Sequence, residues 1–357
     1  MRPCSVAVVG SDQPGGMCQS IIEGFEANGI KTELIPYSSW FPKVHKVGWR
    51  GTGILQGFVH DAVRGPYAGK LVALLDSHNP DFVLFIKADN ISSLAFRALR
   101  AAYRRPLVAF HPDDPFNTGT LIRPGPSHRN AINQMEFTDL YLSWSWAVLD
   151  KAKDHGATRT EYLPFACDPE LHRVPELTEA DREVYGSDVT FVGNWDTERE
   201  RVIGPLAERC AAAGIKLAIW GSAYWERCEH PAAKAAWRGR PLLGEEMAKA
   251  ARASALNLNI LRAQNKGETN MRTFEVPCSG GFILHERSPA LDHWLPPGKA
   301  CAQFSDAEEA FTQIRHYLDH PKEREQIRQR GHEIARAWTY KEWTAKILDW
   351  VEQLPPR

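Results

Sequence analysis

Short apolar runs alternate with longer amphipathic stretches along most of the chain. Residues 5–9 form an uninterrupted run of small and β-branched residues, which predicts a strand buried on both faces. Residues 19–27 place apolar side chains at helical spacing and predict a helix. The pattern predicts further strands at 31–36, 82–87, 107–111, 140–143 and 160–163, and further helices at 70–77, 92–103 and 147–155. Such alternation predicts a parallel sheet covered by helices on both faces.

A second alternating series follows a change of composition between residues 164 and 188, where prolines and acidic residues predict an interdomain linker. Strands are then predicted at 189–192, 216–220, 255–261 and 282–284, and helices at 197–213, 245–251, 306–318, 322–338 and 341–354. Another helix is predicted to open near Asn270. The last helix carries Trp343, Ile347 and Trp350 on one side and needs a surface to cover them. At 357 residues, the chain is predicted to form two doubly wound α/β domains.

Composition narrows the possible partners. Lys and Arg number 43 against 44 Asp and Glu, which leaves a formal net charge of -1. No global field therefore favours nucleic acid or an anionic membrane, and any phosphate must be held locally. Seven cysteines without a Cys-x-x-Cys pair indicate free thiols, and no apolar run approaches the roughly 20 residues that span a bilayer. We expect a cytoplasmic protein without a nucleic-acid partner.

The segment 266–275 carries the strongest chemical signal. It reads as a polar loop that opens a helix, with Arg272 and Glu275 one turn apart. Free backbone N–H groups and the positive end of the helix dipole attract a phosphate, which Arg272 can bind through its fork. Glu275 can accept hydrogen bonds from sugar hydroxyls. A helix-surface ion pair is the alternative for both side chains, and the remaining donor-binding candidates of the segment are Lys266, Thr269, Asn270 and Met271.

Two other turns of the second domain are candidates for the same ligand. Gly193 and Asn194 follow the first strand of that domain, with Arg199 just beyond them, and Gly221 and Ser222 follow the next strand. Glycine lets a ligand approach the main chain closely, and a basic residue near the turn suits a phosphate. Arg199 as a solvated helix residue is the simpler alternative.

In the first domain, the candidates also follow strands. His111 and Asp113 come after the strand at 107–111, where a doubly wound fold places its ligand crevice. A carboxylate there could deprotonate an acceptor hydroxyl, and His111 could contact the transferred sugar. Gly15 and Gly16 follow the first strand and could admit an acceptor or a phosphate, although Gly-Gly is common in turns without function. The stretch 37–69 is rich in aromatic, glycine and basic residues without a clear period, and its role stays open.

Several motifs together resemble one family. They are the segments at 188–194, 257–260, 270–275, 280–283, 304–306 and 339–340, with the His-Pro-Asp-Asp-Pro turn of 110–116 upstream. In this order they resemble the CgeB-like, spore-maturation type of glycosyltransferase of the GT-B superfamily. The resemblance is strong over about 188–350 and thinner before it.

The resemblance implies a GT-B fold: two Rossmann-like domains face each other across a cleft, and the C-terminal helix crosses back to the N-terminal domain. It implies an acceptor domain at 1–165, completed by 340–357, and a donor domain at 186–338 that binds a nucleotide diphosphate sugar without a metal or cofactor. Glu275 matches the glutamate that binds the donor ribose, and His111, Asp113 and Arg272 are the catalytic candidates. Retaining relatives carry another glutamate eight positions earlier, where this chain has Gly267, with Glu268 one step away.

The predicted reaction is therefore transfer of a sugar to a hydroxyl acceptor, with the anomeric configuration retained. Two alternatives stay open: a nucleotide-sugar epimerase on the same fold, and a nucleotide-sugar binding protein without catalysis. The sugar, the base, the acceptor (a glycan, a protein or a small molecule) and the oligomeric state are not determined by the sequence.

Overall fold

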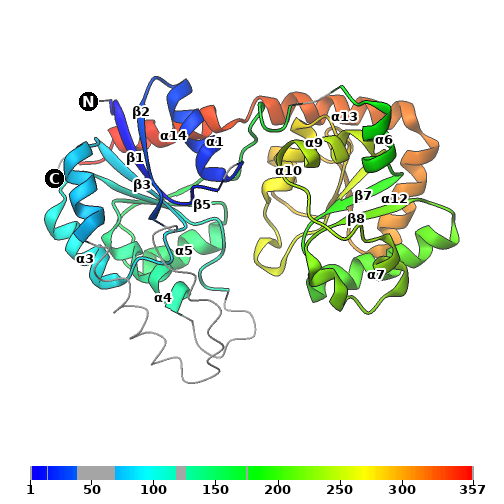
Figure 1. The fold of residues 1–357 in the computed structure, drawn as a ribbon, viewed down its shortest axis with the longest axis horizontal. Coiled ribbons are helices and arrows are strands. Elements are labelled where there is room, and N and C mark those ends of the chain that lie inside the picture. The colour runs from blue at the N-terminus through cyan, green and yellow to red at the C-terminus, as the bar shows by residue number, and fades with distance from the viewer. Residues whose placement is uncertain (1, 14, 38–68, 118–125, 174–175, 356–357) are drawn as a thin grey trace. The chain divides into compact units, whose positions relative to one another are not determined.

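A computed structural model describes the whole chain except residues 1, 14, 38–68, 118–125, 174–175 and 356–357. Nearly all of the stretch 37–69 therefore lies outside the described residues. The chain divides into two compact units (Figure 1). Unit 1 comprises Met1–Pro164 and Tyr340–Arg357, and unit 2 comprises Phe165–Thr339.

Unit 1 is built on a parallel sheet with the order β2-β1-β3-β4-β5-β6. The strands are β1 (Ser5–Val9), β2 (Lys31–Ile35), β3 (Phe82–Ile86), β4 (Leu107–Phe110), β5 (Leu140–Ser143) and β6 (Thr160–Tyr162). Central strands β3, β4 and β5 are buried at every position, as their unbroken apolar runs predict. The chain turns back between β1 and β3, and this reversal is the topological switch point of the unit.

Helices cover the sheet of unit 1. They are α1 (Met17–Ala27), a helical stretch at 69–78, α3 (Ser93–Ala102), α4 (Pro126–Asn133), α5 (Trp146–Asp154) and α14 (Tyr340–Glu352). Ser92 starts α3 because its hydroxyl accepts the N–H of Ala95 at 3.3 Å. Buried aromatic residues such as Phe85, Phe96 and Tyr141 fill the core between sheet and helices.

Helix α14 closes unit 1 from the far end of the chain. Trp343 is fully buried, meets the ring of Phe110 edge-on at 5.2 Å and donates to the carbonyl of Pro164 at 2.9 Å. Gly24 of α1 lies so close that an added Cβ would stand 2.4 Å from the carbonyl oxygen of Tyr340. The predicted apolar face of the last helix is therefore covered by the N-terminal unit.

Unit 2 repeats the plan with a parallel sheet of order β11-β10-β9-β7-β8. Its strands are β7 (Val189–Val192), β8 (Leu217–Trp220), β9 (Leu256–Asn259), β10 (Ile283–Glu286) and β11 (Ala302–Phe304). The reversal falls between β7 and β9. Strand β11 was not predicted, because it is only three residues long and lies at the sheet edge.

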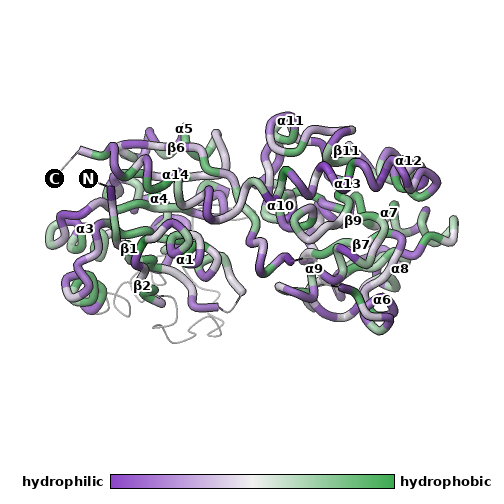
Figure 2. The backbone as a smooth tube through the Cα atoms, turned by 90° about the horizontal axis from the view of Figure 1, so that it is seen from above, coloured by the Kyte–Doolittle hydropathy of each residue, from purple (hydrophilic) through white to green (hydrophobic). Residues whose placement is uncertain are grey.

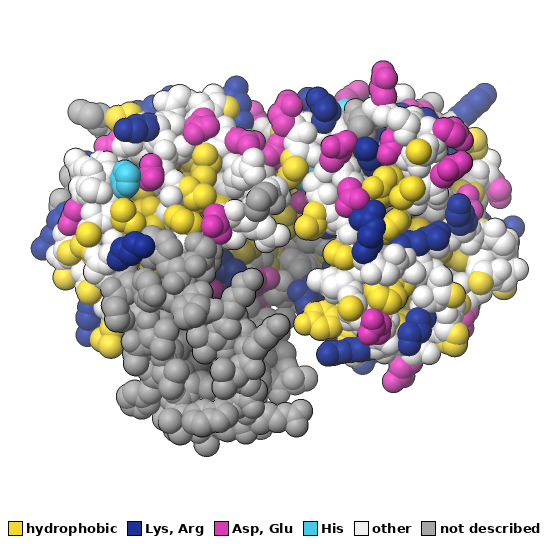
Figure 3. Space-filling view, viewed as in Figure 1, with side chains coloured by type: hydrophobic (Ala, Val, Ile, Leu, Met, Phe, Trp, Pro, Cys, Tyr) yellow, Lys and Arg dark blue, Asp and Glu magenta, His cyan; other side chains and the backbone are white. Residues whose placement is uncertain are grey.

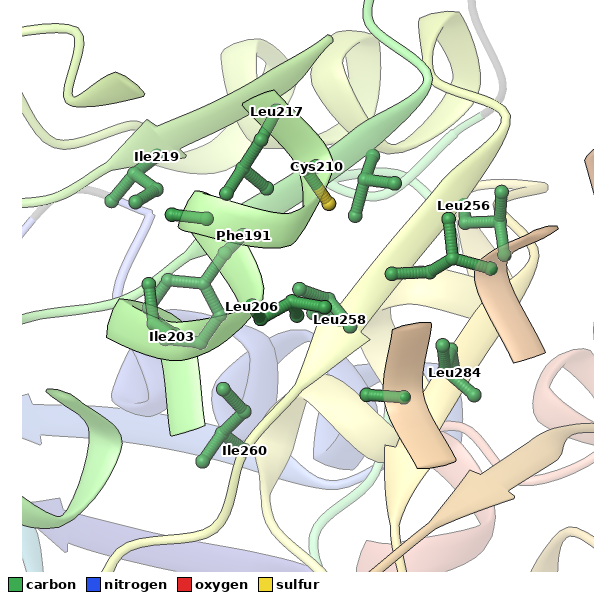
Figure 4. Close-up of a cluster of buried hydrophobic side chains, with 14 of the residues drawn as sticks. Phe191, Ile203, Leu206, Cys210, Leu217, Ile219, Leu256, Leu258, Ile260 and Leu284 are labelled. Carbon is green, nitrogen blue, oxygen red and sulfur yellow. The ribbon is translucent and has the colours of Figure 1, made fainter. Parts of the chain in front are cut away.

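The helices of unit 2 are α6 (Glu179–Tyr185), α7 (Thr197–Ala212), α8 (Pro231–Ala236), α9 (Gly244–Ala253), α10 (Met271–Cys278), α11 (Leu291–Trp294), α12 (Ala307–Asp319) and α13 (Pro321–Arg336). Helix α7 lays Ile203, Leu206 and Cys210 against Phe191 and Leu258 of the sheet (Figure 4). Helix α12 buries Ala310, Ile314 and Tyr317 at helical spacing, and hydrophobic and hydrophilic residues alternate along its tube, as in an amphipathic helix (Figure 2).

The segment that was predicted to be a linker belongs to unit 2. Cys167 forms a parallel bridge with Thr339, and the indole of Trp338 donates to the carbonyl of Phe165 at 2.8 Å. Its acidic residues are also structural, because Asp181 and Thr178 form the capping box that starts α6. A composition typical of a linker here encodes a short capped helix instead.

Candidate functional site

The N-terminus of α10 is the best-defined anion position of unit 2. Asn270 caps the helix: its side chain accepts the N–H of Thr273 at 3.2 Å, and the Thr273 hydroxyl accepts the N–H of Asn270 at 3.1 Å. Asn259, at the end of β9, exchanges two amide hydrogen bonds with Asn270, each 3.0 Å long. Within the described chain, the N–H groups of Met271 and Arg272 have no partner. Two amides thus remain for a ligand at a rigid helix start.

Arg272 and Glu275 form an ion pair one helical turn apart. Glu275 is buried, whereas the side chain of Arg272 is 27% exposed and also reaches the carbonyl of Val192 at 3.4 Å. The ion pair between Arg272 and Glu275, which was the alternative to a ligand-binding role, is therefore present. The guanidinium nevertheless remains accessible at the end of β7. One face of Arg272 orients Glu275, and the other can meet a ligand.

His172 is a neighbour of this pair that sequence reasoning missed. Its side chain is buried, and Nε2 lies 3.9 Å from Oε1 of Glu275. Nδ1 faces the main chain of Asp168, with the carbonyl oxygen at 3.1 Å. His172 was overlooked because it belongs to the segment interpreted as a linker.

Arg199 is held inside unit 2 by main-chain carbonyls. Its guanidinium donates to Asn194 at 2.9 Å and to Ile260 at 3.3 and 3.4 Å, and it stacks over Phe191 at 5.5 Å. Burial lowers the pKa of Arg199 to about 10, still well above neutral pH. Arg199 is therefore not the solvated helix residue of the alternative: it joins the turns that follow β7 and β9.

The two predicted glycine turns contact each other. A Cβ on Gly221 would stand 2.3 Å from the carbonyl oxygen of Gly193 and 2.6 Å from Nε1 of Trp225, so only glycine fits. The N–H of Ser222 donates to the side-chain oxygen of Asn194 at 3.1 Å. The Ser222 hydroxyl is buried and has no partner among the described residues, so it is a polar group left for a ligand or a water.

Further charges gather at the same edge of the sheet. Lys266 pairs with Glu286 at the end of β10, and Arg262, which follows β9, lies 3.5 Å from Asp196. Arg262 and Arg272 both lower the pKa of Arg199, although less than burial does. Arg262 was not among the predicted residues, and its place after a strand is the signal that could have found it. Thr269, another predicted residue of this segment, is fully buried.

Over the described residues of unit 2, the carboxyl edge thus collects the cations Arg199, Arg262, Lys266 and Arg272 and the carboxylates Asp196, Glu275 and Glu286. On the molecular face of Figure 3, by contrast, acidic and basic side chains are mixed. Such a local excess of cations beside free helix amides suits a diphosphate, and the buried carboxylates suit hydroxyl groups.

Unit 1 carries a pocket at its own switch point. Gly10 and Ser11 after β1, Tyr37 after β2, and residues 87–90 after β3 line it. Lys87 and Ala88 have positive φ values of 67° and 36°, a backbone that L-residues adopt rarely and that clusters at functional sites.

Of the predicted residues of unit 1, Asp113 contacts a residue that lines this pocket, whereas Gly15 and Gly16 do not line it. Asp113 pairs with Lys87 at 2.8 Å, and Nε2 of His111 is buried without a partner among the described residues. Burial lowers the pKa of His111 and keeps it neutral. Gly15 and Gly16 do not line the pocket, and their N–H groups are bound by Gln19 at 3.0 Å and Gln13 at 3.0 Å.

No helix within the described ranges is long and apolar enough to cross a membrane. The part of the chain that the structure describes also contains no group of three or more His, Cys, Asp or Glu placed to hold a metal ion. All seven cysteines are free thiols.

Comparison with known proteins identifies the fold. Residues 176–349 match the family model described as "Glycosyl transferase-like". No curated protein sequence matches the chain.

Solved structures match over nearly the whole chain. Anabaena HepE in complex with UDP has a TM-score of 0.63 at 14% identity, covering 98% of this chain and 100% of HepE. Sucrose-phosphate synthase from Thermosynechococcus elongatus has a TM-score of 0.67 at 11% identity, with 98% of each chain covered. The trehalose-6-phosphate synthase OtsA has a TM-score of 0.71 at 13% identity, covering 99% of this chain and 100% of OtsA. The predicted GT-B fold with two Rossmann-like units is confirmed.

Proposed function

We propose that this protein is a glycosyltransferase that moves a sugar from a nucleotide diphosphate donor to a hydroxyl acceptor. One observation carries the proposal. At the switch point of unit 2, the free amides of α10, Arg272 and the buried carboxylate of Glu275 lie next to one another in the first turns of one helix. A nucleotide diphosphate presents a diphosphate next to a ribose diol, which matches that order of groups. The match of residues 176–349 to a glycosyl transferase-like family model supports the same assignment.

For the donor, we propose a uridine diphosphate hexose. HepE, whose fold this chain shares, has been solved with UDP, with UDP and glucose, and with UDP-glucose. In this chain, Glu275 accepts hydrogen bonds from the ribose hydroxyls, and Arg272 with the amides of residues 271 and 272 binds the diphosphate. Arg262 is a further cation available to the phosphates, because its side chain is 53% exposed.

The proposed reaction needs no metal. The bond from the anomeric carbon to the diphosphate breaks, and negative charge develops on the leaving phosphate oxygen, where Arg272 and the helix amides stabilise it. The acceptor oxygen bonds to the anomeric carbon and loses its proton to a base, for which Asp113 is the candidate in unit 1. His111 contacts the transferred sugar as a neutral side chain. Retention of configuration and a CgeB-like subtype belong to the same proposal and rest on the sequence resemblance. A cytoplasmic location also belongs to it and rests on the cysteine pattern and the lack of a long apolar run.

A thermal-shift screen tests the donor site. UDP-, GDP-, dTDP- and CDP-hexoses are each added to the wild-type protein and to the Glu275→Ala variant. We expect the uridine compounds to raise the melting temperature of the wild type and to lose most of that effect in the variant, because binding to the native state alone stabilises it. If no nucleotide sugar shifts the wild type, the assignment fails. If the best ligand stabilises Glu275→Ala equally, the ribose is misplaced.

Product analysis separates the proposed reaction from its alternatives. A glycosyltransferase yields a glycosylated acceptor, an epimerase yields an isomerised donor, and a binding protein yields neither. Donor hydrolysis offers a direct assay while the acceptor is unidentified, because water can replace the acceptor hydroxyl.

A further inference from the structure

The loop at residues 262–270, between β9 and α10, presents the start of α10 to the proposed donor; we name it the donor loop. The main-chain N–H groups of residues 271 and 272, which are proposed to bind the diphosphate, come directly after the loop. The loop therefore has to be ordered for these N–H groups to point at the ligand. Internal hydrogen bonds order only part of it: Asn265 accepts from Glu268 at 3.0 Å and donates to Arg262 at 2.8 Å. Asn259 holds the end of the loop at Asn270, and further restraints come from β10.

Strand β10 ends against the donor loop and contacts it repeatedly. Oε2 of Glu286 accepts the N–H of Leu261 at 2.8 Å, and Oε1 binds the ammonium group of Lys266. Two residues further along, the hydroxyl of Ser288 donates to the carbonyl of Glu268 at 2.8 Å. Three points of the loop region are thus tied to one strand end.

The burial of Glu286 determines the role of Lys266. The side chain of Glu286 is only 10% exposed, whereas that of Lys266 is 46% exposed. A buried carboxylate without a cation is costly, so Lys266 cannot leave Glu286 for a phosphate without creating an unpaired buried charge. Arg272 is in a different position, since its side chain is 27% exposed and its Nη2 is not used in the contacts with Glu275 and Val192.

We infer that Glu286 is a positioning residue which, together with Ser288, clamps the donor loop, and that Lys266 is the counter-ion of Glu286 rather than a ligand of the donor phosphates. The inference rests on the proposed function for the identity of the ligand. It replaces the donor-binding role first predicted for Lys266. In the resemblance, retaining relatives have a glutamate at the position of Gly267 in this loop. Here Glu286, from β10, brings a carboxylate to the same loop.

A double-mutant cycle with UDP as the probe tests this inference. Glu286→Gln and Lys266→Met are measured singly and together by calorimetry. We expect each single change to raise the dissociation constant of UDP on the order of tenfold, because binding must then order the loop. The double variant should show about the same tenfold loss, since both single changes remove one ion pair.

Two outcomes of the cycle overturn the inference. If Lys266 binds phosphate and Glu286 merely restrains it, Glu286→Gln strengthens UDP binding. If the two residues act independently, the losses multiply to roughly a hundredfold in the double variant. Glu333→Gln is the matched control, because Glu333 forms an exposed ion pair with Arg330 on α13 and the change removes the same charge.

Amide hydrogen exchange, measured without nucleotide, tests the clamp independently of ligand binding. Glu286→Gln should speed exchange at Leu261 and through the donor loop, and Ser288→Ala should do so near Glu268 without the loss of a charge. Unchanged exchange in both variants contradicts the clamp. If the wild type binds no UDP, the proposed function fails together with the ligand assigned to the loop, while the exchange rates still decide whether the clamp exists.

Discussion

The carboxyl edges of the two sheets share a topology but differ in chemistry. In unit 2, the edge holds several cations and carboxylates that pair with one another, and a capping box fixes the N-terminus of α10. Among the described residues of unit 1, the corresponding edge holds a small pocket, an ion pair between Lys87 and Asp113, and the buried Nε2 of His111, which has no hydrogen-bond partner there. One fold thus offers a rigid site suited to a charged ligand and, separately, a site for groups of little charge.

The largest expected effect concerns Arg272. Arg272→Met should raise the dissociation constant of UDP on the order of a hundredfold, because a charge-assisted contact of about 2–3 kcal/mol is lost. The change also leaves the buried carboxylate of Glu275 without its cation, so the free energy of unfolding should fall by about 3 kcal/mol. Calorimetry and urea denaturation measure the two effects. Arg330→Met, at an exposed pair, is the control and should alter neither.

Two glycine substitutions test whether the units respond separately. Gly221→Ala drives a methyl group against Gly193 and Trp225 in unit 2, and Gly24→Ala drives one against Tyr340 in unit 1. Each should cost about 3 kcal/mol of stability through overpacking. Hydrogen exchange should rise only in the unit that carries the change. Gly69→Ala is the control, because the added methyl group meets no described residue within 4 Å. A rise in exchange that is equal in both units for either variant would refute separate responses.

Acid should destabilise unit 2 through His285. Burial lowers the pKa of His285 to about 4, against about 6.5 when unfolded. Between these values the unfolded state binds more protons, so stability falls as the pH drops from about 6.5 towards 4. From pH 7 to pH 5, this histidine should cost about 2 kcal/mol.

Urea denaturation at the two pH values measures this loss. His285→Gln should remove much of the difference, while His172→Gln, at another buried histidine of unit 2, provides the comparison. An equal pH response in the wild type and His285→Gln would show that other groups titrate instead.

The smallest effect is expected at the exposed pair of unit 1. The side chains of Lys87 and Asp113 are 48% and 42% exposed, so Lys87→Met should change stability by less than about 1 kcal/mol. UDP affinity should stay within about twofold of the wild type, because the proposed nucleotide site lies wholly in unit 2. A loss of UDP affinity comparable to that of Arg272→Met would break the contrast between the two edges.

Periodicity alone predicted most of the fold, since the buried strands are continuous apolar runs and α14 carries its apolar stripe openly in the sequence. The capped start of α10 was also readable from local residues. Elements whose signal is brief were missed: β11 is short, and α6 is marked by a capping box inside an acidic segment.

The site was less predictable because its contacts join distant segments. Nothing local links Lys266 to Glu286, 20 positions later, or His172 to Glu275. Arg199 could be placed after β7, but its burial against the carbonyl of Ile260 depends on the fold of another strand. Residue types and strand ends are visible in a sequence, whereas the choice of partner is made by packing.

The discontinuity of unit 1 has a consequence for how the protein is made. The segment 340–357, which contains α14, follows the 175 residues of unit 2, numbered 165 to 339. At translation rates of about 5–20 residues per second, the N-terminal strands wait roughly 10–35 seconds on the ribosome for the helix that covers α1. During that interval, the α1 surface around Gly24 is bare, so aggregation in the cell should be decided in the nascent chain before the last helix emerges.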